Sequence, residues 1–567
     1  MELLLKKHFG YDKFRPLQLD IINRVLQKKD SLVLMPTGGG KSICYQIPAI
    51  QLEGLTIVVS PLISLMKDQV DNLKANGIKA EFINSTLSYS EIEEIKERIK
   101  QNDVKILYVA PERLALEKFK RFLLTLNISL IAIDEAHCIS EWGHDFRKDY
   151  GNLKLFKTLF PETPIIALTA TATLKVREDI LKQLALVNPQ TFISSFDREN
   201  LNIIVTEKKK TFNKILGLVK KHQGEPTIIY CFSRKDTMKV AKQLREGGFN
   251  ALPYHAGLSS ELRQKNQDLF IKDEVNIIVA TIAFGMGIDK PDVRLVIHHT
   301  FSKSLEGYYQ EIGRAGRDGL SSDCVLFYSK GDIIKHKFFL KNIYNPLMKS
   351  TALNKLNRMM SFCESSLCRR KSILEYLGES YSGNNCNGCD ICKGGLGIKV
   401  VSGVSEVVSK GRTVSKKIVV SGVDTGLFQK LRALRLKIAR RKNCPPYIVF
   451  GDVSLREMVS YLPKNNAEFL QIKGVGHNKL SDYGEAFLDV INDHTTESEK
   501  VNIKTDYHKR IEQIQETSPN AYASWGVDDD DRLRRLFELS VSVDEIARIL
   551  KRQPGAIRSR LRKFGLE

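Results

Sequence analysis

Two adjacent carboxylates, Asp134 and Glu135, follow directly after a short apolar run at residues 130–133. A run of this length and composition is typical of a buried strand in a parallel sheet. In open α/β sheets, ligands bind beyond the carboxyl ends of the strands. Oxygen ligands at that edge suit a hard cation that accompanies a nucleotide phosphate. The pair therefore predicts a metal–nucleotide site at the end of this strand.

The segment after the carboxylates is aromatic and basic. It contains Trp142, Phe146 and Arg147, and His137 lies between this segment and the carboxylates. Aromatic rings and guanidinium groups stack on exposed bases without regard to their sequence. We therefore expect one loop to contact both the nucleotide site and a nucleic acid.

An upstream stretch supplies a phosphate cradle. A strand pattern at residues 31–35 leads into a glycine-rich loop and then into a helical pattern. Consecutive glycines let backbone N–H groups close around phosphate oxygens, and the helix N-terminus adds its dipole. Lys41 would place a positive charge on the β- and γ-phosphates, and the Ser42 hydroxyl would be a ligand for Mg²⁺. The loop residues are Pro36, Thr37, Gly38, Gly39, Gly40, Lys41 and Ser42.

The loop departs from the strict phosphate-loop pattern at Met35, where that pattern has glycine. The alternative is an incidental glycine-rich turn. The preceding strand, the following helix and the downstream carboxylates together favour the phosphate site. Ahead of the loop, Gln18 can bond the donor and acceptor edges of adenine, while Tyr11 or Arg15 can stack on its ring.

The composition indicates a polyanionic partner and no membrane span. The chain has 567 residues, a net charge of +21 and a pI near 9.3, which favours nucleic acid as the partner. No apolar run reaches the ~18 residues of a membrane span, and we expect no signal peptide at Met1. Five of the ten cysteines cluster between residues 363 and 392, which indicates metal binding in a reducing, cytoplasmic compartment.

The alternation of apolar runs with helical patterns predicts an α/β fold with two mostly parallel sheets. Strand patterns in the first part of the chain lie at residues 31–35, 56–60, 106–110, 130–134 and 164–168. A second set begins near residue 201 and lies at residues 227–232, 277–281, 295–299 and 324–328. No second phosphate loop accompanies the second set, so we expect one nucleotide site to serve both sheets.

Two further loops carry groups that suit a nucleotide site. Residues 169–172 bring small hydroxyl groups that can bond a phosphate or the His137 side chain. In the second part, Arg314 and Arg317 lie on one side of a helical turn. A guanidinium aimed at a γ-phosphate stabilises charge in the transition state and is worth roughly 10³–10⁵ in rate. The alternative is an exposed ion-pair helix, but the first part has no comparable arginine pair beside its own site.

These motifs closely resemble those of RecQ-family DNA helicases, within helicase superfamily 2. The resemblance spans roughly residues 1–395 and rests on residues 35–42, 134–147 and 308–319. The aromatic loop distinguishes RecQ from other helicases. The resemblance implies two tandem RecA-like domains, an adenine-binding motif at Tyr11, Arg15 and Gln18, and ATP-driven unwinding with 3′→5′ polarity. The implied catalytic residues are Lys41, Asp134, Glu135, Gln310, Arg314 and Arg317.

The cysteine cluster suits a tetrahedral Zn²⁺ site. Cys386, Cys389 and Cys392 are closely spaced and form three of the ligands, while the spacing leaves the fourth open between Cys368 and Cys363. The RecQ zinc subdomain places a cysteine before Arg-Arg, which favours Cys368. Cys363 would then be a buried apolar residue.

The sequence departs from the family after the zinc cysteines. Bacterial RecQ proteins usually continue with a winged-helix domain of roughly a hundred residues, an ordinary domain size, whose hairpin wedges the duplex apart. Here only residues 393–422 precede the next helical pattern. That pattern resembles the HRDC domain, with basic residues such as Arg435 on its first helix and a glycine-containing loop, residues 469–479, that suits a phosphate. A solvated basic helix surface without a ligand is the alternative for the first helix. Residues 524–567 resemble a Myb-like helix–turn–helix with a basic last helix, although protein docking is an alternative.

We therefore predict two RecA-like parallel-sheet domains, a zinc-binding subdomain and small all-α C-terminal domains. The predicted boundaries are 1–200 and 201–330 for the RecA-like domains, 331–395 for the zinc subdomain, 396–422 for a linker, 423–494 for the HRDC-like domain, 495–523 for a second linker and 524–567 for the helix–turn–helix.

The whole pattern predicts an ATP-dependent DNA helicase of repair or recombination that uses ATP, Mg²⁺ and Zn²⁺. Ser42 and Asp134 would hold Mg²⁺, and Trp142, Phe146 and Arg147 would contact DNA. We expect a monomer that acts at the nucleoid on single-stranded and forked duplex DNA, with DNA-repair proteins as partners. Two alternatives stay open: an RNA helicase, and a remodeller that uses ATP to change its grip without processive unwinding.

Overall fold

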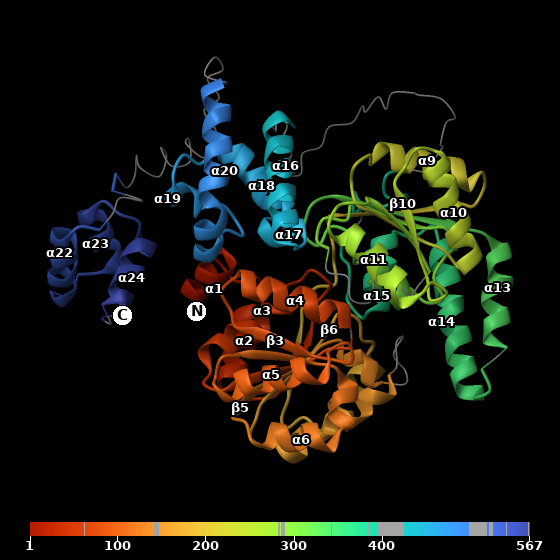
Figure 1. The fold of residues 1–567 in the computed structure, drawn as a ribbon, viewed down its shortest axis with the longest axis horizontal. Helices are drawn as coiled ribbons and strands as arrows, with labels where there is room; N and C mark the ends of the chain where they lie inside the picture. Colours follow the sequence, from red (N-terminus) through yellow and green to blue (C-terminus); the bar gives the residue numbers. More distant parts are fainter. Residues whose placement is uncertain are drawn as a thin grey trace.

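The structure is a computed structural model that covers the two α/β domains and the regions that follow them (Figure 1). It describes residues 1–61, 63–140, 147–281, 284, 290–341, 343–383, 385–394, 425–497, 519–520, 525–539, 541–564 and 566. Within these residues, no helix combines the length and the apolar character that crossing a membrane requires. The predicted linker at 396–422 lies outside the described residues, and so does most of the one at 495–523.

The first domain is built on a seven-stranded parallel sheet in the order β3-β4-β2-β5-β6-β1-β7. Its inner strands are buried because helices cover both faces of the sheet. The strands are β1 (Ser31–Leu34), β2 (Leu55–Val59), β3 (Ala80–Ile83), β4 (Ile106–Val109), β5 (Ile128–Ile133), β6 (Ile165–Thr169) and β7 (Gln190–Ile193). The helices are α1 (Glu2–Phe9), α2 (Gln18–Leu26), α3 (Ile43–Gln51), α4 (Ile63–Ala75), α5 (Tyr89–Lys100), η1 (Pro111–Ala115), α6 (Glu117–Leu124), η2 (Ala136–Ile139), η3 (Lys148–Lys154), α7 (Leu155–Leu159) and α8 (Leu174–Gln183).

The second domain repeats this architecture with a six-stranded parallel sheet in the order β10-β11-β9-β12-β13-β8. The strands are β8 (Leu201–Glu207), β9 (Thr227–Tyr230), β10 (Ala251–Tyr254), β11 (Ile277–Ala280), β12 (Leu295–His298) and β13 (Ser322–Tyr328). The helices are α9 (Thr211–Lys221), α10 (Arg234–Glu246), α11 (Ser260–Ile271) and α12 (Leu305–Ile312). The predicted α/β fold with two parallel sheets is confirmed.

The sequence patterns located the inner strands of both sheets and missed the edge strands. In the first sheet, β3 and β7 lie at the two edges, and in the second sheet β10 and β8 do. β7 exposes three of its four residues, so it lacks the continuous apolar run of a strand buried on both faces. An edge strand of this kind is short and polar, and periodicity alone does not separate it from a loop.

The zinc region follows the second sheet and is attached to its outer strand. Its helices are α13 (Lys330–Leu340), α14 (Pro346–Glu364) and α15 (Arg369–Tyr376). The Ile203 N–H on β8 donates to the Gly388 carbonyl oxygen at 2.8 Å, and the Asp390 N–H donates to the Ile203 carbonyl oxygen at 3.1 Å. The segment that carries the cysteines therefore pairs with the backbone of the second sheet.

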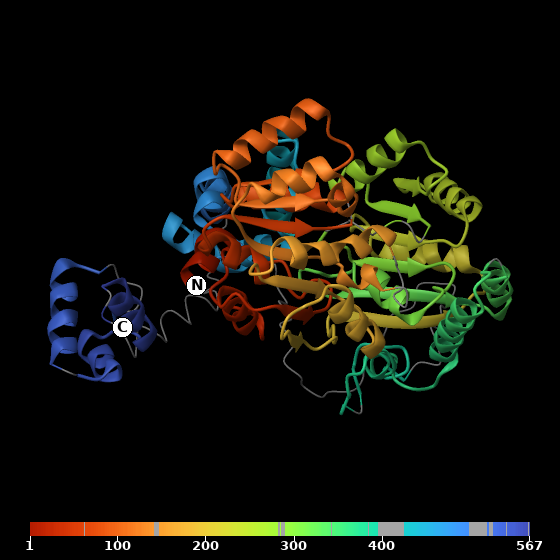
Figure 2. The ribbon, with the colours of Figure 1, turned by 90° about the horizontal axis from the view of Figure 1, so that it is seen from below.

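Two separate groups of helices complete the chain. The first group is α16 (Thr425–Arg441), α17 (Pro446–Val449), α18 (Asp452–Tyr461), α19 (Asn466–Phe469) and α20 (His477–Glu497), and the second is α22 (Val527–Glu538), α23 (Val543–Leu550) and α24 (Pro554–Lys563). Each group has its own apolar core. Figures 1 and 2 show the second group apart from the α/β domains, whereas the first group lies against them.

The last helix, α24, is less free for DNA than its sequence suggested. Arg560 donates to the Asp530 carboxylate at 2.7 Å from its Nε, and its guanidinium also lies over the Trp525 ring at 5.3 Å. Arg560 therefore stabilises the three-helix core. Arg558, Arg562 and Lys563 are the other basic residues of this helix, and their contact with a nucleic acid stays a prediction.

Candidate nucleotide site and metal centre

The phosphate loop connects β1 to α3 and depends on its glycines. Gly38 and Gly40 have φ values of 80° and 86°, in the left-handed region that residues with a side chain rarely adopt. The Lys41 ammonium donates to the Met35 carbonyl oxygen at 3.2 Å, so it lies across the loop that is predicted to cradle phosphates. Methionine at position 35 is buried and supplies this carbonyl, and the backbone there does not require glycine.

The two carboxylates follow β5 and are coupled to the loop after β6. Asp134 accepts a hydrogen bond from the Glu135 N–H at 2.9 Å, and its carbonyl oxygen accepts one from the Tyr150 hydroxyl at 2.9 Å. Glu135 has a φ of 46°, which turns the chain sharply at the strand end. The His137 Nδ1 atom lies 2.9 Å from Thr169 Oγ1, so the predicted contact of the hydroxyl loop with His137 is confirmed.

One oxygen of Glu135 is left for a ligand. Its Oε2 atom is buried and has no hydrogen-bond partner among the described residues. It lies 3.3 Å from His137 Nδ1, but that nitrogen is already bonded to Thr169. A buried carboxylate oxygen without a partner is costly unless a ligand or water binds it. This atom is therefore the site's clearest acceptor for a water molecule.

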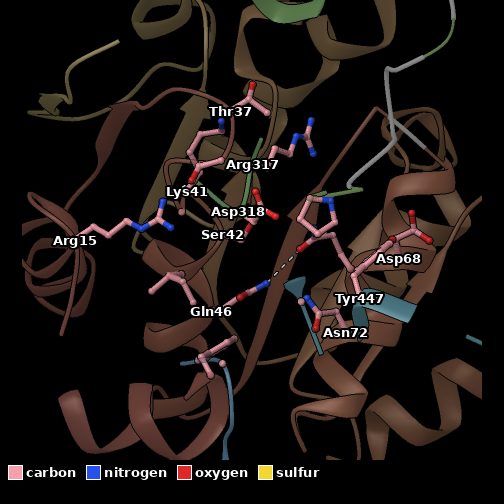
Figure 3. A pocket seen from close by; sticks show the side chains of 18 of the residues that line it. Arg15, Thr37, Lys41, Ser42, Gln46, Asp68, Asn72, Arg317, Asp318 and Tyr447 are labelled. Atoms are coloured by element: carbon pink, nitrogen blue, oxygen red, sulfur yellow. Dashed lines mark hydrogen bonds between the residues drawn. The ribbon is translucent and has the colours of Figure 1, made fainter. Parts of the chain in front are cut away.

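Residues of both α/β domains line a single cavity of about 670 Å³. The predicted site residues in its wall are Tyr11, Arg15, Gln18, Thr37, Gly38, Gly40, Lys41, Ser42, Asp134, Glu135, Gln310, Arg314 and Arg317. Gly39 does not line the cavity, and its N–H donates to the Pro36 carbonyl oxygen at 2.9 Å. Figure 3 shows Lys41 and Ser42 of the first domain near Arg317 and Asp318 of the second.

Arg314 and Arg317 reach the cavity from the turn after α12, residues 313–319, which we call the arginine turn. A Cβ built on Gly38 would lie 3.2 Å from the Arg317 Cα, so the second domain's backbone touches the phosphate loop. Burial lowers the pKa of Arg314, and the nearby Arg317 cation lowers it further, whereas Tyr230 and Glu135 act in the opposite direction. A buried guanidinium with a second cation beside it favours an anion between them.

Arg198 joins the two halves of the site and was not predicted. Its guanidinium donates to the carbonyl oxygens of Thr37 at 2.6 Å and of Ala315 and Gly316 at 2.8 Å each. It therefore ties the phosphate loop to the arginine turn from the segment that connects the two sheets. A lone arginine in a connecting segment forms no motif, and its partners are backbone carbonyls, so the sequence carried no signal for it.

The predicted adenine-binding residues contact the phosphate loop directly. The Gln18 side chain donates to the Gly40 carbonyl oxygen at 2.9 Å and accepts from the Arg15 N–H at 2.8 Å. The Arg15 guanidinium donates to the Gly38 carbonyl oxygen. Tyr11 is 44% exposed and lines the cavity. These residues position the loop, and their contact with adenine stays a prediction.

The helical domain at 425–497 forms part of the cavity wall. Tyr447, Ser454, Gly474 and Lys479 line the cavity, and Figure 3 shows Tyr447 beside Asp68 and Asn72 of α4. Burial lowers the pKa of Lys479 to about 8. This contribution was not predicted, because the domain resembles a nucleic-acid-binding module and lies more than 300 residues beyond the phosphate loop.

The interpretation of Arg435 as part of a basic, nucleic-acid-facing helix was wrong. Arg435 is 1% exposed, and its guanidinium donates to the Asp452 carboxylate at 2.9 Å and to the Phe450 carbonyl oxygen at 3.0 Å. Asp452 also lies 3.2 Å from Arg294 of the second domain. Arg294 in turn pairs with Asp318. Arg435 therefore positions Asp452, and Asp452 links the helical domain to Arg294 of the second domain, beside the arginine turn.

The glycine-containing loop at 469–479 packs against the first domain. The Gly474 N–H donates to the Gly10 carbonyl oxygen at 3.1 Å. A Cβ on Gly476 would lie 2.6 Å from the Lys7 carbonyl oxygen. The glycines permit close approach, as expected, here to the backbone of α1 and of Gly10, and a phosphate contact of this loop stays a prediction.

Four cysteines form a metal-binding group. The Sγ atoms of Cys368, Cys386, Cys389 and Cys392 all lie within 4.8 Å of one another, and those of Cys368 and Cys389 are 4.0 Å apart. A tetrahedral Zn²⁺ with Zn–S bonds near 2.3 Å places its thiolates about 3.8 Å apart, so the group fits zinc. Cys363 is buried outside the group. The predicted grouping with Cys368 is therefore confirmed.

The predicted nucleic-acid loop is described only at its end. Trp142 and Phe146 lie outside the described residues. Arg147 donates from Nη1 to the Pro61 carbonyl oxygen at 2.8 Å, and its N–H donates to the Cys138 carbonyl oxygen at 2.9 Å. Arg147 therefore braces the end of the loop against the segment after β2, close to the nucleotide site.

Four family descriptions match successive parts of the chain. They are DEAD/DEAH box helicase at residues 15–180, Helicase conserved C-terminal domain at 207–319, RecQ zinc-binding at 330–393 and HRDC domain at 424–491. The zinc-binding match ends at 393 and the HRDC match begins at 424, so only residues 394–423 lie between them.

Similar proteins match most of the chain. The ATP-dependent DNA helicase RecQ of Haemophilus influenzae is 38% identical over 87% of this chain and 95% of its own length. The ATP-dependent DNA helicase RecQ of Bacillus subtilis is 38% identical over 86% of this chain and 98% of its own. The ATP-dependent DNA helicase Q-like 2 of Arabidopsis thaliana is 40% identical over 82% and 64%, respectively. With its helicase domains, its four-cysteine zinc module and its HRDC domain, this chain belongs to the RecQ family of helicases.

Proposed function

We propose that this chain is an ATP-dependent DNA helicase that unwinds duplex DNA with 3′→5′ polarity in repair or recombination. Its membership of the RecQ family supports ATP-dependent DNA unwinding. The observation that carries the mechanism is the convergence of groups from both α/β domains on one cavity. A cavity of this kind changes shape when the domains move, so it can convert hydrolysis into motion.

We assign phosphate binding to the first domain. Lys41 lies across the glycine loop, where its ammonium would neutralise charge on the β- and γ-phosphates. The Ser42 hydroxyl and the Asp134 carboxylate line the same cavity and are the hard oxygen ligands that Mg²⁺ prefers. The metal would offset the negative charge of the phosphates when ATP binds.

We assign the activation of water to Glu135. Its buried Oε2 atom has no hydrogen-bond partner among the described residues, and a general base needs such a lone pair. The imidazole of His137 lies between this carboxylate and Thr169. A shift of the carboxylate on hydrolysis would therefore reach the loop after β6.

We assign stabilisation of the transition state to the second domain. Arg317, with Arg314 beside it, would neutralise charge that develops on the γ-phosphate, and Gln310 would help to position the phosphate and water. Arg198 holds these groups against the phosphate loop. Hydrolysis then loosens the closed arrangement, and repeated closure and release would move the domains along one strand.

We further propose that the chain acts as a monomer in the cytoplasm, at the nucleoid, on single-stranded and forked duplex DNA. DNA-repair proteins are its proposed partners. The net charge of +21 supports phosphate binding without regard to base sequence.

A strand-displacement assay on a 3′-tailed duplex tests the proposed function. The wild-type protein should release the labelled strand with ATP, whereas Glu135→Gln should bind ATP and DNA but release none. A 5′-tailed duplex of the same sequence is the polarity control. Stimulation of hydrolysis by single-stranded RNA but not by DNA would identify an RNA helicase. Stimulation by DNA without release of any strand would identify a remodeller.

A further inference from the structure

The hairpin formed by α13 and α14 exposes a group of large apolar side chains. Seven of them lie between residues 334 and 353, among them Ile334, Phe338, Tyr344 and Leu347. Tyr344, in the turn between the helices, is 96% exposed. A concentration of exposed apolar side chains on one element marks an interaction surface.

The same hairpin is strongly basic. Residues 333–363 contain five lysines and one arginine but no aspartate or glutamate. Lys335 and Lys355 have acidic partners outside this range, at 2.8 Å and 3.6 Å. Lys337, Lys341 and Lys349 leave a positive surface around the exposed rings. Cations interleaved with exposed aromatic rings suit a nucleic acid, because the cations can contact its phosphates and the rings can stack on its bases.

The base of the hairpin lies at the carboxyl end of the second sheet. Asp332 at the start of α13 pairs with Lys208, which follows β8, at 2.6 Å. His336 lies 2.9 Å from the carbonyl oxygen of Phe301, which follows β12. This is the edge at which ligands of open α/β sheets bind. Figure 1 shows α13 and α14 at the margin of the second domain, with their free end directed away from its sheet.

The hairpin is also coupled to the nucleotide site. The Phe362 ring of α14 packs against Tyr308 of α12 at 5.5 Å between centroids, and Lys355 lies 3.6 Å from Glu306. Helix α12 leads directly into the turn that carries Arg314 and Arg317. A movement of the arginine turn during hydrolysis would therefore move α14.

We propose that the α13–α14 hairpin binds the junction between single-stranded and duplex DNA, with Tyr344 as the strand-separating side chain. The inference rests on the proposed unwinding activity. An exposed ring at the tip of a supported hairpin can stack on the last base pair, while the lysines hold the phosphates on either side. Residues 394–423, between the zinc-binding match and the HRDC match, are fewer than a domain of ordinary size has, so we look for the separating element among the described residues of the zinc region.

The first test compares unwinding with hydrolysis in a double variant. Tyr344→Ala with Phe338→Ala should slow strand displacement on a 3′-tailed duplex about tenfold or more, because the stacking surface is lost. ATP hydrolysis stimulated by single-stranded DNA should stay within about twofold of the wild type, because neither side chain lines the nucleotide cavity. Tyr89→Ala is the matched control, since Tyr89 is 79% exposed on α5 of the first domain. Normal displacement by the double variant overturns the proposal and assigns the hairpin to a protein partner.

The second test locates the hairpin on DNA and does not depend on unwinding. A fork with 5-iododeoxyuridine at the first paired position, irradiated without ATP, should form an adduct on Tyr344 that mass spectrometry detects and that Tyr344→Ala removes. An adduct elsewhere in the chain, with none on the hairpin, overturns the proposal. If the wild type forms the adduct on Tyr344 but displaces no strand, the junction site stands and the proposed helicase function fails.

A charge test separates phosphate contacts from stacking. Lys341→Glu with Lys349→Glu should weaken fork binding and flatten the dependence of log affinity on log salt. Lys239→Glu with Lys242→Glu is the control, because both are exposed lysines on α10 of the same domain and the net charge changes by the same amount. An equal effect of the control and of the hairpin variant would mean that only overall charge matters, which overturns a specific contact at the hairpin.

Discussion

The first α/β domain carries the phosphate loop after β1 and the carboxylate pair after β5, with the hydroxyl loop after β6 between them. The second domain has the same parallel architecture, but it reaches the cavity through α12 and the arginine turn. One sheet thus positions the groups that we propose bind ATP, and the other positions the cations that we propose stabilise the transition state. From this difference we predict that ATP binding depends mainly on the first domain, whereas hydrolysis needs both.

The largest effect should follow removal of the phosphate-binding charge in the first domain. Lys41→Ala should abolish ATP hydrolysis and unwinding, because no second phosphate loop occurs in the sequence. Binding of single-stranded DNA without nucleotide should stay largely intact. Steady-state hydrolysis and fluorescence anisotropy measure the two properties. Substantial residual hydrolysis would reveal a second nucleotide site, and the assignment of ATP binding to the first domain alone would then be wrong.

Removal of the arginine in the second domain should separate turnover from binding. Arg317→Ala should lower kcat roughly 10³-fold, because the cation acts on charge that develops in the transition state. The Kd of a fluorescent ATP analogue should rise less than about tenfold. Arg317→Lys should restore only part of kcat, since a point charge does not replace the planar guanidinium. Equal losses of affinity and turnover would place Arg317 in ground-state binding.

Arg198 tests whether the two domains must be held together. Arg198→Ala should lower kcat/KM about tenfold, because hydrogen bonds between the phosphate loop and the arginine turn are lost. A thermal melt of the same protein shows whether the fold is retained. Arg198→Lys should be intermediate, because one ammonium cannot reach all of the carbonyls. An unchanged kcat/KM would mean that the domains close without this link.

The aromatic loop should couple the first domain to DNA. Trp142→Ala should keep the basal rate of hydrolysis and lose about tenfold of the stimulation by single-stranded DNA, since a stacked base is worth roughly 1–3 kcal/mol. The measurement is the rate of hydrolysis as a function of DNA concentration. Normal stimulation would remove the loop from the mechanism.

The smallest effect should come from the C-terminal helices, which lie apart from both domains (Figure 2). Truncation after Asn520 should leave hydrolysis stimulated by single-stranded DNA near normal. It should weaken binding to forked DNA a few-fold and flatten its salt dependence, because the basic residues of α24 would contact phosphates. A salt titration of both proteins decides this, and unchanged slopes would assign these helices to a protein partner.

The sequence identified the inner strands and the phosphate loop for a local reason. A strand buried on both faces needs a continuous apolar run, and a loop around phosphate needs neighbouring glycines, so each leaves its pattern in adjacent residues. The edge strand β7, with one buried residue out of four, left no such pattern. Arg435 was predicted at the surface but forms a buried ion pair, because adjacent residues do not record this difference either. A basic residue looks alike in sequence whether it faces solvent or Asp452.

The sequence by itself predicted the phosphate loop, the carboxylate pair and the arginine pair that meet at one cavity, together with the zinc cysteines at 386, 389 and 392 and the family, because these depend on short, contiguous motifs. The tertiary structure decided what joins them. Arg198 and Thr37 are 161 residues apart in the chain, and Arg294 and Asp452 are 158 apart. It also distinguished Cys368 from Cys363 and showed that the rings of the α13–α14 hairpin are exposed. Contacts of this kind depend on how separate elements pack, and no local pattern of residue types specifies them.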